Sequence, residues 1–78
     1  MENKYAKVEC WINSNWPHEV LAIPKPAVEN LASAIIVRKS SLPDFEEIML
    51  QNISKSKNFE EDKKKIVDFF ESLKKEFK

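Results

Sequence analysis

The chain has 78 residues, 42% of them hydrophobic, and its 13 basic and 13 acidic residues give a formal net charge of zero. This balance is typical of a folded globular protein and excludes the charge-rich, apolar-poor composition of disordered chains. The chain contains no glycine, which excludes the glycine-rich loops that bind phosphates and dinucleotides.

Residues 4–23 are compatible with two structures, of which we expect a two-stranded β-hairpin. Apolar and polar residues alternate over residues 6–12, and a short apolar run follows at residues 19–23. A loop centred on Ser14 gives one consistently apolar face, on which the cross-strand neighbours are Ala6 with Ala22, Val8 with Val20, Cys10 with His18, and Ile12 with Trp16. In the alternative, a helix, the residues that line up are Met1, Tyr5, Val8 and Ile12.

Two helices are predicted in the middle of the chain. The first spans residues 26–39, with Pro26 in its first turn and a β-branched run at residues 35–37 that weakens its end. The second spans residues 43–54, with Ser41 as the expected N-cap. Its apolar face is expected to contain Phe45, Ile48, Met49 and Ile53.

The third helix is predicted over residues 59–77 and carries the largest apolar surface in the chain. Its stripe consists of Phe59, Ile66, Phe70, Leu73 and Phe77. We therefore expect one domain over residues 1–78, of the α+β class, in which the N-terminal two-stranded β-hairpin packs on about three α-helices. The alternative is an all-α small helical bundle.

The only cysteine and the only histidine lie close together in the sequence, at Cys10 and His18. In the hairpin they would be neighbours, and a cysteine beside a histidine can form a thiolate nucleophile. No signature of an oxyanion hole accompanies the pair, and two ligands do not make a structural zinc site. We expect Cys10 to be a packed apolar residue, and we expect no enzyme activity, no metal and no cofactor.

The outer face of the hairpin would carry Tyr5, Trp11, Leu21 and Ile23. Tryptophan and tyrosine are frequent anchors in protein interfaces, so these four residues are the predicted binding surface. The alternative is that they are simply part of the core. Trp16 is expected to face inward with Ile12.

These observations favour a non-enzymatic protein-binding module that inhibits, neutralises or adapts a larger protein partner, or that associates with itself as a homodimer. One cysteine cannot form an internal disulfide, which favours the cytoplasm, and the apolar run at residues 31–37 is too short to span a membrane. The alternative is a small nucleic-acid-binding regulator in which Trp11 or Trp16 stacks on bases beside Arg38. The chain has twelve lysines and one arginine, which argues against nucleic-acid binding. Lysine lacks the planar guanidinium group with which arginine makes paired hydrogen bonds to phosphates and bases.

Overall fold

The N-terminal segment is a helix, and the expected hairpin is wrong. The computed structural model describes residues 3–77, which form α1 (Lys4–Asn15), α2 (Lys25–Val37), the short 3₁₀ helix η1 (Lys39–Ser41), α3 (Leu42–Asn52) and α4 (Phe59–Glu76). Residues 3–77 contain no β-strand. The fold is therefore not α+β; it fits the all-α alternative, a small helical bundle.

Local chemistry explains why α1 forms. The side chain of Asn3 caps the helix by accepting hydrogen bonds from the backbone N–H groups of Tyr5 and Ala6, at 3.1 and 3.4 Å. Val8 and Ile12, four residues apart, are the buried residues of α1. A spacing of four residues places both side chains on one face of the helix. The hairpin would have had the disadvantage of placing Glu9 opposite Glu19. Met1, the first residue of the expected helical stripe, lies outside the described residues.

The turn after α1 is held by Trp16 and Pro17, which are both buried. Pro17 ends the helix because a residue that precedes proline is disfavoured in the α conformation, and Trp16 has extended backbone angles. The indole N–H of Trp16 donates a hydrogen bond to the carbonyl of Leu21. This bond gives the buried donor a partner and folds the connection to α2 back over the end of α1.

Proline sets the start of α2 and α3, as the sequence predicted. Pro26 and Pro43 each occupy the second position of their helix, where the missing N–H has no intrahelical partner to lose. Ser41 stands at the N-cap of α3, but its side chain makes no capping hydrogen bond. The bounds of both helices agree with the prediction to within two residues.

The prediction of α4 is confirmed. Ile66, Phe70 and Leu73 are fully buried, and Phe59 and Phe77 pack against the core while remaining half-buried. Charge also matches the helix dipole. The first turn contains three acidic residues, Glu60, Glu61 and Asp62, and the last turn contains Lys74 and Lys75.

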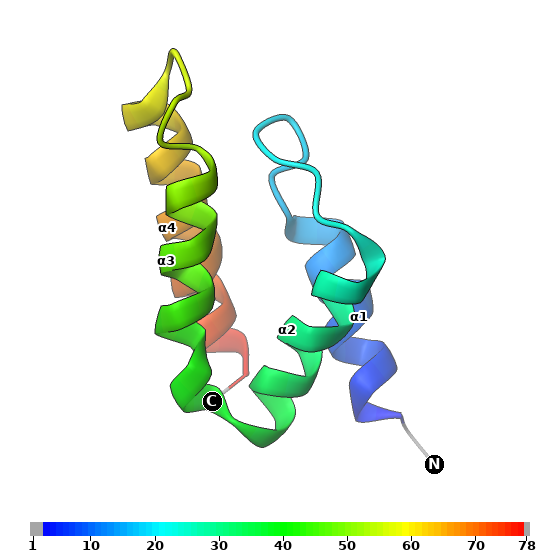
Figure 1. Cartoon of the computed structure of the whole chain (residues 1–78). Coiled ribbons are helices and arrows are strands. Elements are labelled where there is room, and N and C mark those ends of the chain that lie inside the picture. The colour runs from blue at the N-terminus through cyan, green and yellow to red at the C-terminus, as the bar shows by residue number, and fades with distance from the viewer. Residues whose placement is uncertain (1–2, 78) are drawn as a thin grey trace.

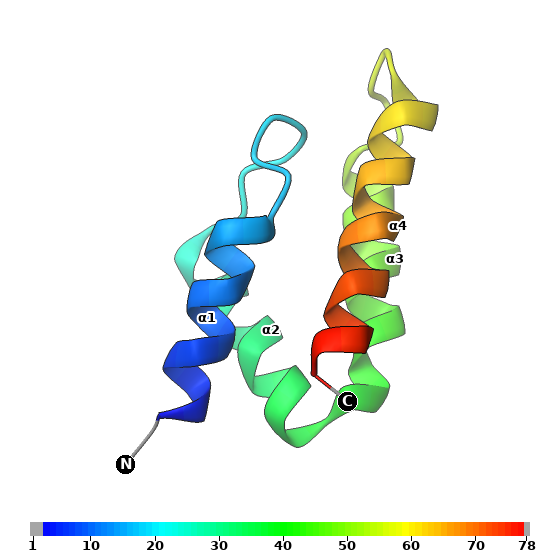
Figure 2. The ribbon, with the colours of Figure 1, turned by 180° about the vertical axis from the view of Figure 1, so that it is seen from behind.

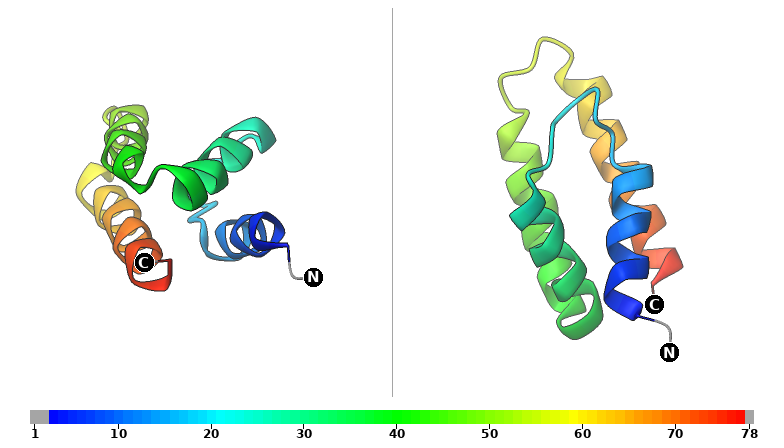
Figure 3. Two further views of the ribbon diagram at one scale, coloured as in Figure 1. Left: turned by 90° about the horizontal axis from the view of Figure 1, so that it is seen from below. Right: turned by 90° about the vertical axis from the view of Figure 1, so that its right-hand side faces the viewer.

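The four α-helices of residues 3–77 form two antiparallel hairpins (Figure 1). α1 and α2 make the first hairpin, α3 and α4 make the second, and η1 joins them at one end of the molecule. Seen along the helices, the four elements surround a common centre (Figure 3). The molecule is elongated, with extents of 45 × 22 × 20 Å.

Aromatic rings join the two hairpins at the back of the bundle. The ribbons of α1 and α4 lie apart there (Figure 2), and large side chains fill the space between them. The ring of Phe69 lies 5.6 Å from that of Trp11 and 4.9 Å from that of Trp16, measured between centroids. Phe77 meets Trp11 edge-on at 5.5 Å. Pairs at such distances add to the stabilisation that burial alone provides, so this aromatic cluster fixes α1 on α4.

Candidate functional site

The four residues of the predicted binding surface lie on two elements. Tyr5 and Trp11 belong to α1, whereas Leu21 and Ile23 belong to the connection between α1 and α2. All four are half-buried and pack against the core. They do not form the outer face of a β-ribbon, because the ribbon does not exist. Whether any of them contacts a partner stays a prediction.

Trp11 is in contact with two aromatic rings from α4 and its C-terminal end. One of its neighbours, Phe77, is edge-on at an interplanar angle of 86°, and the other, Phe69, is tilted at 40°. These contacts give Trp11 a role in holding α1 on α4. Trp16 is buried, as expected, beside the same Phe69. A buried indole has no free face for a nucleic-acid base to stack on.

Tyr5 remains a neutral phenol at neutral pH. Desolvation raises the pKa of its hydroxyl group above the ordinary value, and the nearby carboxylates of Glu29 and Glu9 raise it further. The side chain can therefore donate a hydrogen bond, but it does not supply a phenolate for chemistry.

Cys10 and His18 do not form the neighbouring pair that the hairpin required. Cys10 is exposed on α1, so its predicted place in a packed face is wrong. His18 is also exposed, and its Nε2 lies 3.2 Å from the backbone carbonyl oxygen of Asn13. Within residues 3–77 no cluster of three or more histidine, cysteine or acidic side chains is arranged to hold a metal ion.

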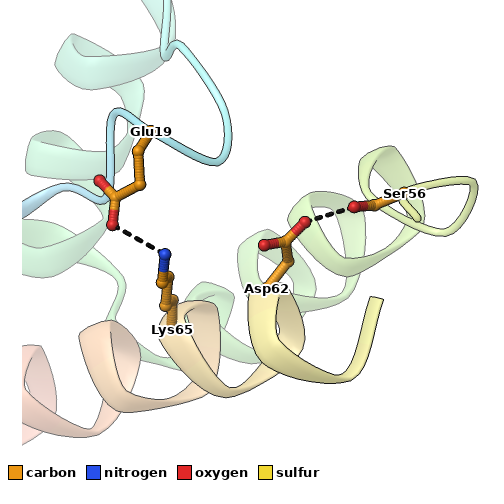
Figure 4. Close-up of polar contacts among 4 residues, drawn as sticks. All are labelled: Glu19, Ser56, Asp62 and Lys65. Carbon is orange, nitrogen blue, oxygen red and sulfur yellow. Dashed lines mark hydrogen bonds and ion pairs between the residues drawn. The ribbon is translucent and has the colours of Figure 1, made fainter. Parts of the chain in front are cut away.

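An ion pair ties the connection after α1 to α4. Lys65 Nζ lies 3.1 Å from a carboxylate oxygen of Glu19 (Figure 4). The pKa of Glu19 is lowered, first by a hydrogen bond from the backbone and then by Lys65. Both side chains are exposed, so the pair orients the connection more than it stabilises the fold. Figure 4 also shows Ser56, whose hydroxyl donates to the carboxylate of Asp62 and ties the last loop to the first turn of α4.

The large apolar side chains most exposed among residues 3–77 lie elsewhere, on α2 and α3. Val37 is 72% exposed, Ile48 is 51% exposed and Ile36 is 37% exposed. The sequence predicted that Ile48 would share the inward face of its helix, and this prediction is wrong. Ile36 and Val37 belong to the β-branched run at the end of α2, and β-branching by itself does not indicate whether a side chain is exposed.

Val37 and Ile48 belong to one surface, which we call the α2–α3 strip: Val37, Ser41, Phe45 and Ile48. Phe45 and Ile48 share one side of α3, and Ser41, the N-cap residue, precedes Phe45 by four positions on the same side. Val37 and Ser41 line the same hollow of about 330 Å³, together with Asn30, Ser33, Ala34 and Arg38. The strip therefore combines the hollow at the end of α2 with the exposed side chain of Ile48 on α3, and the half-buried Phe45 lies between them along the helix.

Further hollows border the bundle, including one of about 430 Å³ beside Cys10 and Asn13 on α1. Another, of about 380 Å³, lies beside Trp11 and includes the Glu19–Lys65 ion pair. A third, of about 290 Å³, lies where the first turn of α1 meets the end of α4. No helix among the described residues combines the length and the apolar character needed to cross a membrane. Comparison of the chain with protein-family models, with curated proteins and with solved structures finds no match.

Proposed function

We propose that the chain is a small non-enzymatic protein-binding module of the cytoplasm, which inhibits, neutralises or adapts a larger protein partner. The observation that carries the proposal is the exposure of two large apolar side chains, Val37 at the end of α2 and Ile48 on α3. Large apolar side chains that lie together in water are typical of a protein contact surface.

The shape of the strip is suited to a protein segment. Ser41 and Ile48 are seven residues apart, which corresponds to about 10 Å along a helix at 1.5 Å per residue. The adjoining hollow is lined by the small side chains of Ser33, Ala34 and Ser41, so a partner side chain can approach the backbone of α2 closely. Burial of Val37 and Ile48 would each contribute about 1 to 2 kcal/mol, because both now expose more than half of their surface.

Photo-crosslinking in the cell that makes the protein tests this proposal. A photoreactive phenylalanine analogue replaces Val37 in one variant and Ile48 in a second. In a third, control variant it replaces Cys10, which is exposed on α1 in the other hairpin. We expect positions 37 and 48 to crosslink to the same larger protein and position 10 not to do so.

Other products would contradict the proposal. A crosslink to a second copy of this chain would replace the larger partner with self-association, and a product that nuclease removes would favour the nucleic-acid alternative. Equal crosslinking from position 10 would show that the α2–α3 strip is not the contact surface.

A further inference from the structure

The hollow at the end of the bundle combines an apolar floor with a basic rim. Its volume is about 290 Å³, and it is lined by Lys4, Lys7 and Val8 from α1, Ile35 and Ile36 from α2, Lys39 from η1, and Glu76 and Phe77 from the end of α4. This volume is just below the range for drug-sized ligand sites, roughly 300–1,000 Å³. The hollow is separate from the α2–α3 strip, with which it shares no residue.

The floor is formed by core residues that the fold holds in place. Val8 and Ile35 are buried and belong to the central hydrophobic cluster. Phe77 is half-buried, and its ring is fixed edge-on against Trp11. Ile36 lies at the border of the hollow and is partly exposed. The apolar surface that a ligand can reach is therefore mainly that of Phe77 and Ile36, because Val8 and Ile35 are each only 2% exposed.

The rim carries an excess of positive charge. It has three ammonium groups, from Lys4, Lys7 and Lys39, against the single carboxylate of Glu76. Among residues 3–77 none of these three lysines has a carboxylate within ion-pair distance. Their long aliphatic stems can lie along the apolar wall while the ammonium groups reach the mouth of the hollow.

The helix dipole of α1 adds to this excess. Lys4 and Lys7 lie in the first two turns of α1, and the first turn contains no acidic residue. Cations near the positive end of a helix are unfavourable, and a bound anion would offset that cost. The carboxyl ends of α2 and α4 also reach the hollow and carry partial negative charge. An anionic group is therefore expected on the side of α1 and Lys39.

We infer that this hollow binds a small apolar carboxylate of the class of medium-chain fatty acids. The hydrocarbon tail lies against Ile36 and Phe77, and the carboxylate meets the ammonium groups of Lys7 and Lys39. Burial of the tail supplies the attraction, and the basic rim selects an anionic head over a neutral or cationic one.

A titration with three probes that share one tail tests the inference. The ¹⁵N-labelled protein is titrated with decanoate, with decanol and with decyltrimethylammonium, each below the concentration at which it aggregates, and amide shifts are followed by NMR. We expect saturable shifts at Val8, Ile35, Lys39 and Phe77 with decanoate, and binding at least tenfold weaker for the other two probes. No saturable shift, equal binding of the cationic probe, or shifts centred on Ile48 would overturn the inference.

Charge reversal provides the matched control. The double variant Lys7→Glu, Lys39→Glu should weaken decanoate binding at least tenfold. The double variant Lys55→Glu, Lys57→Glu changes the net charge equally in the loop at the other end of the bundle, and it should change the affinity by less than twofold. Circular dichroism spectra that match the wild type establish that both variants are folded. Equal weakening in the two variants would show that net charge, and not this hollow, governs binding.

Discussion

Phe70 lies at the centre of the core, and its truncation to alanine measures how strongly the fold depends on α4. The side chain is fully buried and meets Phe69 edge-on at 5.3 Å. Removal of a buried phenylalanine ring costs about 3 to 5 kcal/mol. A domain of this size is stable by only about 4 to 12 kcal/mol in total. We therefore expect Phe70→Ala to remove a large part of the free energy of unfolding.

Thermal unfolding followed by circular dichroism measures this effect. A loss of 3 kcal/mol or more should lower the melting temperature by at least about 12 °C. Phe59→Ala is the matched control, because it makes the same substitution in the same helix at a half-buried position. The control should cost clearly less. A Phe70→Ala protein that melts within a degree or two of the wild type, or a control that costs as much, would refute the assignment of the core.

Three further predictions follow from the contacts of single residues. Trp16→Ala and Trp11→Ala should both lower the melting temperature. Trp16→Ala should lower it more, because Trp16 is buried and Trp11 is only half-buried. The reverse order would contradict the packing of α1 on α4. Cys10→Ser and Cys10→Leu should both melt within a degree or two of the wild type, since the thiol is exposed, and a cooperative loss of structure in either would show that Cys10 is packed. The carboxyl group of Glu19 should titrate below its ordinary pKa of 4.5 in ¹³C NMR, so that its stabilising contribution is present at neutral pH and is lost as the pH falls through the lowered pKa. Lys65→Met should raise this pKa, and an identical pKa in the variant would argue against the ion pair.

The sequence predicted α2, α3 and α4 because each helix carries a clear local signal. Pro26 and Pro43 mark the starts of two of them, and the apolar stripe of α4 repeats with a clear helical period. The N-terminal segment gave conflicting signals. Val8 and Ile12 are four residues apart, and this spacing puts them on one face of a strand as well as on one face of a helix. The packing of α1 against α2, together with the aromatic contacts to α4, favours the helix.

The candidate site was harder to predict, because exposure depends on which helices meet. Trp11 was expected on an open face, but Phe69 and Phe77, far away in the sequence, partly cover it. Ile48 has the spacing of a core residue, yet the neighbours of α3 cover only part of its apolar surface. Neither outcome can be read from a local pattern, since both depend on contacts between the two hairpins.

The affinity of the crosslinked partner for variants of the α2–α3 strip tests the proposed function most directly. Val37→Asp and Ile48→Glu each place a charge on an exposed part of the strip, while Asn13→Asp adds the same charge on the exposed side of α1. We predict that each strip variant raises the Kd at least tenfold, which corresponds to about 1.4 kcal/mol of binding free energy. The melting temperature of each variant should be unchanged. Asn13→Asp should leave the Kd within twofold of the wild type. A Kd that stays within twofold of the wild type in both strip variants would contradict the claim that this surface binds the partner.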